Sequence, residues 1–209
     1  MRGIVSGFGQ NFSTATVNAI ALPLPTSLAG VTVKVKDSAG VERLSPLFFV
    51  SPQQINYQIP DGTVGGQAIV TVTASDGRAH GGLVQIDSTA PAIFTTNQQG
   101  TGAAAALDAL TYAAAPFNAS QSNGQPNILA IFGTGLGADA TDVDGNVNAS
   151  VEARIDGLAV TVEYAGRAPG FVGLNQFNIV LPVGISSGTH TLTVSRNGAA
   201  GNPVTIAIK

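Results

Sequence analysis

Hydrophobic and polar residues alternate with a period of two along most of the chain. A period of two is typical of β-strands that bury one face. Turn-forming pairs such as Asp76-Gly77, Asp156-Gly157 and Asn197-Gly198 separate the alternating segments. Short strands with turns at intervals of about 8 to 12 residues predict a β-sandwich or barrel. The alternating segments are residues 31–36, 55–59, 68–73, 160–164, 177–181, 192–195 and 204–208.

The second half of the chain repeats the first. The repeat motif, to which we assign a structural role, is Gln54, Asn56 and Pro60, which recurs 122 positions later as Gln176, Asn178 and Pro182. Glycine, threonine and valine residues after the motif match at the same spacing, and with small gaps residues 5–9 match 129–133 and residues 31–33 match 160–162. The pattern predicts two copies of one all-β unit.

Each copy has the size of an immunoglobulin-like sandwich. We therefore expect an all-β chain of two tandem immunoglobulin-like β-sandwich domains, residues 1–92 and residues 126–209. Residues 93–125 form an Ala/Gly-rich connector, in which the alanine-rich stretch 103–115 is either a short helix or a strand.

The composition excludes several functions. Only 10% of the residues are charged and the net charge is −3, so the chain lacks the basic surface that binds nucleic acid. No apolar run is long enough for a membrane-spanning helix, and with no cysteine there is neither a disulfide nor a thiolate site. The start of the sequence lacks the features of a signal peptide, which indicates either a cytosolic protein or part of a longer exported chain.

Three segments carry a family resemblance: residues 23–31, 47–56 and 165–178. They resemble the Solibacter-type uncharacterized C-terminal domain of large exported bacterial proteins, notably from Acidobacteria, and more loosely IPT/TIG immunoglobulin-like domains. The resemblance implies an extracellular or cell-surface location and no catalytic residue. Members usually carry a further strand before the position of Gly3, so we expect the first unit to lack an edge strand or to borrow one.

Two motifs in the second copy suggest ligands. Residues 133–138 fit the dinucleotide pattern G-x-G-x-x-A, but acidic turn-forming residues follow instead of a helix, so we interpret the motif as a turn. Oxygen ligands for Ca²⁺ gather in the next segment, although we favour a solvated acidic hairpin loop as their explanation. These weak calcium candidates are Asp139, Asp142, Asp144 and Asn146. We expect no other cofactor.

The remaining candidates are polar and aromatic. Gln54, Asn56 and Gln58 share one strand face, as do Gln176 and Asn178, and bind either a sugar or, as we favour, neighbouring loop backbone. No nucleophile motif accompanies the histidines, His80 and His190, of which we expect the second at the rim of the sandwich. In the loop 167–171, Phe171 is expected to close the end of the sandwich, the alternative being an exposed ring that stacks on a sugar.

These observations predict a non-catalytic extracellular structural or interaction module, a spacer or adhesion element of a larger exported protein. One alternative is an accessory carbohydrate-binding module. Another is a strand-exchanging subunit of an extracellular assembly, because an open edge of the first unit could accept a strand. The expected partners are neighbouring domains, or protein or glycan at the cell surface, and self-assembly is a further alternative.

Overall fold

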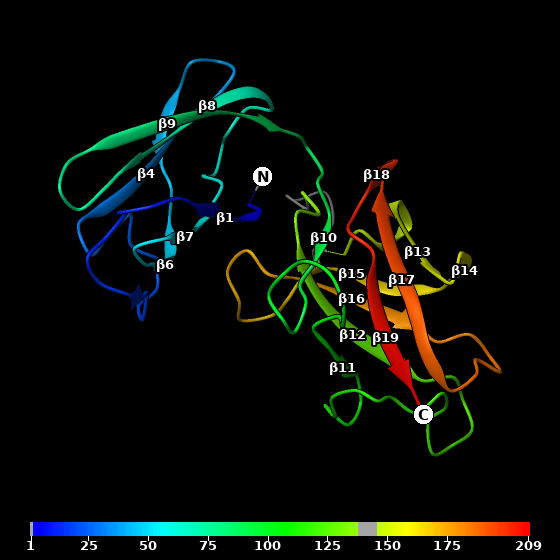
Figure 1. Ribbon diagram of the computed structural model, residues 1–209. Coiled ribbons are helices and arrows are strands. Elements are labelled where there is room, and N and C mark those ends of the chain that lie inside the picture. Colours follow the sequence, from blue (N-terminus) through cyan, green and yellow to red (C-terminus); the bar gives the residue numbers. More distant parts are fainter. Residues whose placement is uncertain (1, 138–145) are drawn as a thin grey trace. The chain divides into compact units, whose positions relative to one another are not determined.

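The computed structural model describes residues 2–137 and 146–209, and the chain forms two compact units, Met1–Ser88 and Thr89–Lys209. Each unit is a sandwich of two antiparallel sheets (Figure 1), which confirms the expected tandem immunoglobulin-like β-sandwiches. Among the described residues there is no helix of the length and hydrophobicity needed to span a membrane.

The first unit consists of a four-stranded sheet and a five-stranded sheet. One sheet has the order β1-β7-β6-β2 and the other β3-β4-β8-β9, with β5 beside β4. The strands are β1 (Ile4–Phe8), β2 (Val17–Asn18), β3 (Ser27–Leu28), β4 (Val31–Lys36), β5 (Glu42–Leu44), β6 (Leu47–Val50), β7 (Gln54–Gln58), β8 (Gly66–Thr73) and β9 (Ala79–Ile86).

The second unit has the same arrangement with additional strands. One sheet has the order β10-β12-β16-β15, with β11 also on β12, and the other has the order β14-β13-β17-β18, with β19 also on β17. Its elements are β10 (Ala92–Ile93), β11 (Ala106–Asp108), β12 (Ile128–Thr134), the 3₁₀ helix η1 (Asn148–Ser150), β13 (Val151–Ile155), β14 (Leu158–Val160), β15 (Val162–Arg167), β16 (Asn175–Val180), β17 (Gly188–Arg196), β18 (Ala199–Ala200) and β19 (Val204–Ile208).

Strand registers show how closely the two units correspond. Phe8 pairs with Gln54 as Phe132 pairs with Gln176, which matches the alignment of residues 5–9 with 129–133. In both units a register shift interrupts the next strand pair at the same place. It lies beside Asn56 in the pairing of β6 with β7, and beside Asn178 in the pairing of β15 with β16. The internal repeat is therefore a repeat of structure as well as of sequence.

One part of the sequence alignment is wrong. Residues 31–33 and residues 160–162 have the same sequence, Val-Thr-Val, but they do not occupy equivalent strands. In the first unit β4 pairs with β8, and the equivalent pair in the second unit is β13 with β17. Val33 lies opposite Val72, and Ala153 lies opposite Val194, so the counterpart of β4 is β13. Residues 160–162 belong instead to the end of β14 and the start of β15.

The expected connector contributes to the second sandwich. Its alanine-rich stretch forms β11, which pairs antiparallel with β12, and contains no helix. Ala104 and Phe117 are buried in the core of this unit. The stretch supplies strands because its small residues alternate between a face on the core and a face toward solvent, and it belongs to the second compact unit.

Candidate functional site

The second sandwich is closed on one side by the segment 92–108, which we call the strand-A segment. In immunoglobulin strand letters, β12 is strand B, β17 is F and β19 is G, so the segment takes the place of strand A. Ala106 pairs antiparallel with Ile131 of β12, and Ala103 forms a parallel bridge with Thr205 of β19. The strand-A segment therefore joins the two sheets along this side.

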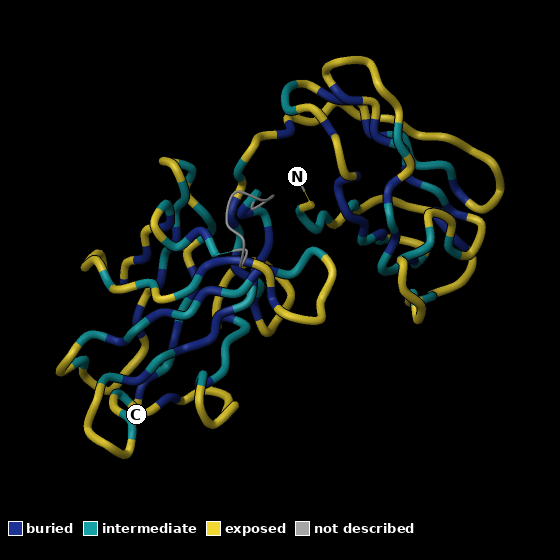
Figure 2. Tube along the Cα trace, turned by 180° about the vertical axis from the view of Figure 1, so that it is seen from behind, coloured by how far each residue is buried: buried dark blue, intermediate teal, exposed yellow. Residues whose placement is uncertain are grey.

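Within residues 2–88, the described part of the first unit, no strand lies at the corresponding place. Its strand B is β1 and its strand G is β9, and each is the edge strand of its sheet. Every residue of β9 except Ile86 is exposed, and exposed backbone is drawn in yellow in Figure 2. The sequence predicts that the first unit lacks or borrows an edge strand, and by comparison with the second unit the position without a strand is that of strand A.

An open groove of ≈ 670 Å³ lies between β1 and β9 of the first unit. Val5 and Gly7 line it from β1, Gly82 and Val84 line it from β9, and Tyr57 and Val70 also contribute. Both strands that flank the groove are at the edge of their sheets, and an edge strand is a place where a further strand can be added. This combination makes the open groove the candidate functional site.

One end of the open groove is closed by an aromatic ring. In the second unit, Gly133 allows the backbone carbonyl of Ala92 to approach closely. The corresponding glycine of the first unit is Gly9, and the ring of Phe12 packs against it instead. The groove therefore corresponds to the part of the strand-A segment that pairs with β12, and not to β10.

The polar side chains at the groove are few. Arg78 donates through Nε to the Asp76 carboxylate at 2.7 Å. His80 lies opposite Val72, and its side chain makes no hydrogen bond within the part of the chain that the structure describes. The residue 122 positions further on is Asn202, whose Oδ1 accepts from the Ile93 amide at 2.8 Å. His80 thus lies where the second unit has a side chain that binds the backbone of β10.

The repeated amides bind each other. Gln54 Nε2 donates to Asn56 Oδ1 at 2.8 Å, and Gln176 Nε2 donates to Asn178 Oδ1 at the same distance. The predicted role was a bond to loop backbone. The bonds of Gln54 and Gln176 run along the strand instead, whereas Gln58 Nε2 donates to the backbone carbonyl of Arg2 at 3.0 Å. The repeated prolines start equivalent turns, since the Pro60 and Pro182 carbonyls accept from the amides of Thr63 and Ile185.

The calcium candidates are mostly outside the described residues, which exclude Asp139, Asp142 and Asp144. Asn146 is described, and its Oδ1 accepts from the amides of Asn148 at 3.0 Å and Ala165 at 3.1 Å. Calcium binding stays a prediction. In the neighbouring glycine motif, Gly135 has a φ of 79°, which fits a turn, and the last residue of the motif lies outside the described part.

His190 is buried beside Asp156 and not at the rim. Its Nδ1 lies 2.6 Å from Asp156 Oδ2, and its Nε2 lies 2.9 Å from the Ser186 carbonyl oxygen. The bond to Asp156 raises the pKa of His190, and the same bond, followed by that from the Thr191 amide, lowers the pKa of Asp156. Both ring nitrogens are engaged, so this pair ties the turn after β13 to β17.

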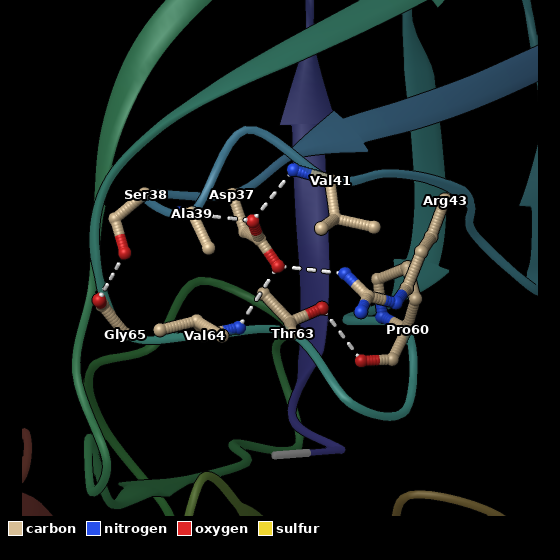
Figure 3. A network of polar contacts seen from close by, with 9 residues as sticks. All are labelled: Asp37, Ser38, Ala39, Val41, Arg43, Pro60, Thr63, Val64 and Gly65. Carbon is tan, nitrogen blue, oxygen red and sulfur yellow. Dashed lines mark hydrogen bonds and ion pairs between the residues drawn. The ribbon is translucent and has the colours of Figure 1, made fainter.

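Asp37 forms a comparable network in the first unit, and the sequence did not single it out. Figure 3 shows its carboxylate accepting from the amides of Val41 and Val64 and from Arg43 Nη1 at 2.6 Å. The Val64 bond is the main cause of its lowered pKa. Asp37 links the turn after β4 to the approach to β8, and Asp156 links the turn after β13 to β17, which is an architectural role in both units.

Phe171 does not close the end of the second sandwich. Its side chain is exposed, while Ala168 of the same loop is buried. The hydroxyl of Tyr164 donates to the Arg167 carbonyl at 2.7 Å, which positions the loop. The expected plug is therefore wrong, because the turn at Gly170 directs the ring outward.

Comparisons with known proteins add fold-level likenesses. No family profile and no curated protein matches the chain. Solved structures similar to it include the Bacteroides ovatus mixed-linkage glucan utilization protein SGBP-B with a heptasaccharide, at 14% identity and a TM-score of 0.36, covering 96% of this chain and 42% of that one. Domains 5–6 of the S-layer protein SbsC match at 14% identity and a TM-score of 0.32, covering 100% and 89%. Titin domains A168–A170 match at 13% identity and a TM-score of 0.29, covering 100% and 64%. The chain thus spans less than half of SGBP-B, and none of these scores reaches 0.5.

Proposed function

We propose that this chain is a non-catalytic interaction module of a larger exported protein, and that its first sandwich accepts a further β-strand along the groove between β1 and β9. The open groove between β1 and β9 is the observation that carries this proposal. Strand addition suits such a site, because backbone hydrogen bonds to the edge strands supply affinity and the groove selects side chains. The second sandwich, which contains its own strand A, then acts as the structural element.

The place of action that we propose is the cell surface or the extracellular space. The proposal rests on the resemblance to the Solibacter-type C-terminal domain, of which we take the chain to be a member. The low charge agrees with it, since strand faces filled by Thr, Ser, Asn and Gln pack against a neighbouring domain at small desolvation cost. The S-layer domains and the titin domains named above belong to multidomain proteins, which is the arrangement we propose here.

Strand acceptance is tested by attaching a strand in front of β1. Residues 100–112, fused through a glycine–serine linker before Arg2, reach the open groove at a high effective concentration. We expect slower amide hydrogen exchange in β1 and β9 and a higher melting temperature for the first unit. A matched fusion with Ala104→Pro and Ala106→Pro controls for the added chain, because proline cannot donate to a strand. Equal exchange in both fusions would contradict strand acceptance.

Carbohydrate binding is the second candidate, and the exposed ring of Phe171 is the observation that favours it. An exposed aromatic ring can stack on a sugar face. The solved structure of SGBP-B contains a bound glucan heptasaccharide, which makes mixed-linkage glucan a reasonable first ligand to try. A glycan array with the wild type and the Phe171→Ala variant tests this candidate, and a signal that the variant retains would count against it.

A further inference from the structure

Tyr112 of the second sandwich combines an exposed ring with an unfavourable backbone conformation. Its side chain is 75% exposed, and its φ of 58° lies in the left-handed region. That region is costly for a bulky residue and is ordinarily taken by glycine, asparagine or aspartate. The chain thus keeps a large aromatic residue where a smaller one would be more stable, although the ring adds nothing to the core. Strained residues of this kind cluster at binding sites.

A buried aspartate fixes the backbone of this turn. Asp108, the last residue of β11, accepts through Oδ1 from the amides of Leu110 at 3.0 Å and Thr111 at 2.8 Å. The Tyr112 amide donates to the Asp108 carbonyl at 2.9 Å. These bonds hold the strained conformation in place, and the turn presents two exposed apolar side chains, Leu110 and Tyr112.

An amide-rich loop is fixed to the same aspartate. Asn127 is 1% exposed, and its Nδ2 donates to Asp108 Oδ2 at 2.8 Å and to the Asn118 carbonyl at 3.0 Å. The segment 118–126 contains the exposed amide residues Asn118, Asn123 and Gln125. An aromatic ring and several amide groups therefore lie on two loops that share one anchor.

The surroundings of these loops carry little charge. Residues 109–137 and 181–187 contain no charged residue, and the second segment is joined to Asn127 through the Leu181 amide. The Asp108 carboxylate is buried and already accepts from three donors. A cation borders the loops at Lys209, whose backbone amide donates to a carbonyl of the preceding segment. A neutral ligand with hydroxyl groups suits this surface better than an ionic one.

We propose that Leu110, Tyr112 and the amides of segment 118–126 form a binding site for a neutral β-linked glycan. In such a glycan the axial C–H groups of each pyranose ring form an apolar face, on which the Tyr112 ring stacks. The amide groups donate to and accept from the equatorial hydroxyls.

This site is separate from both sites proposed above. β11 pairs with the start of β12, so the Tyr112 turn lies at that end of the second sandwich. The loop of Phe171 follows β15, whose end lies beside the end of β12 across β16. The inference therefore rests neither on strand acceptance nor on Phe171.

Titration of the full chain with cellohexaose tests the proposal. The chain has no tryptophan and three tyrosines, so tyrosine fluorescence reports contact with the ring, and calorimetry measures the affinity. The comparison ligand is a β-1,4-linked glucuronate hexamer, which has the same backbone with a carboxylate on each ring. We expect it to bind at least about ten-fold more weakly than cellohexaose, because most of its charges would lose water without gaining a cation.

Variants locate the site. Tyr112→Ala should weaken cellohexaose binding about ten-fold through loss of the stacked area, and Tyr112→Phe should stay within about three-fold of the wild type. Tyr112→Asn should lose binding and raise the melting temperature of the second unit, because asparagine tolerates the left-handed region. The matched control is Leu158→Ala, an exposed apolar residue of the same unit outside these loops, which should leave the affinity unchanged.

The outcomes separate this inference from the proposed function. Binding of cellohexaose that requires the ring at position 112 supports the inference. Equal affinities for the two hexamers, or a lower melting temperature of Tyr112→Asn, overturn it. Binding lost in Phe171→Ala and retained in Tyr112→Ala also overturns it and places the sugar at the other loop. Absence of binding by both hexamers overturns the inference and leaves strand acceptance standing, and a Tyr112-dependent dimer in light scattering replaces the glycan by a second copy of the chain.

Discussion

The carboxylate of Asp156 lies 2.6 Å from Nδ1 of His190, and this pair makes the stability of the second sandwich depend on pH. The pKa of His190 is raised above its ordinary 6.5, so its contribution is complete below about pH 6.5 and is lost as the pH rises through the folded-state pKa. The pKa of Asp156 is lowered below 3.8, so its contribution is present above that value and is lost as the pH falls.

We therefore expect maximal stabilisation by this pair between about pH 4 and about pH 6.5. Thermal melting of the second unit across this range measures the effect. Asp156→Asn should lower the melting temperature by a few degrees at pH 6 and remove most of the decline toward alkaline pH. An unchanged pH profile in this variant would show that the pair contributes nothing.

Asp37 should be more important for the first sandwich than an exposed ion pair on the same hairpin. Its carboxylate is fully buried and accepts from Val41, Val64 and Arg43, as Figure 3 shows. Asp37→Asn places an amide group against these donors, so we expect the first unit to melt several degrees lower. The matched control is Glu42→Gln, which breaks the half-exposed pair with Lys34 and should leave the melting temperature nearly unchanged, because solvent screens exposed ion pairs. A similar effect of the two variants would refute the assigned role.

The sequence predicted the strands of the repeat because a half-buried strand requires a period of two. Gln54 and Gln176 take the same register for this reason. The counterpart of β4 could not be found in this way, since residues 160–162 repeat the letters Val-Thr-Val and β13 does not. Strand pairing depends on neighbours in space, and the sequence does not state which segment lies beside β17.

The candidate site was predictable only in outline. A missing strand could be expected, but its identity as strand A follows from the contacts of residues 92–108 with β12 and β19. Asp37 and Asp156 resemble ordinary turn residues in sequence. Their partners Val64 and His190 are 27 and 34 positions away, so nothing local indicates these bonds.

Ser45 offers a test of polar burial. Its hydroxyl oxygen is buried and is without a hydrogen-bond partner among the described residues. Ser45→Ala removes this group, so we expect the first unit to gain about 1 kcal/mol in its free energy of unfolding. Ser51→Ala is the contrasting variant, because Ser51 Oγ accepts from the Gln54 amide at 2.9 Å, and it should lose a similar amount. Denaturation with hydrogen exchange as the readout measures both, and a loss of stability in Ser45→Ala would indicate a partner such as a buried water.

Two strand-B glycines should respond in opposite directions to the same substitution. A Cβ atom on Gly133 would overlap the carbonyl oxygen of Ala92, so Gly133→Ala forces β10 away from β12. We expect it to destabilise the second unit by about 1–3 kcal/mol, as overpacking does. A Cβ atom on Gly7 meets its nearest atoms at 3.9 Å and the φ of Gly7 is not in the left-handed region, so Gly7→Ala should stabilise the first unit by about 0.4–1 kcal/mol through the unfolded state. Hydrogen exchange followed on peptides from each unit separates the two effects. Stabilisation by Gly133→Ala would mean that β10 does not lie against β12, and destabilisation by Gly7→Ala would mean that the groove is closed in solution.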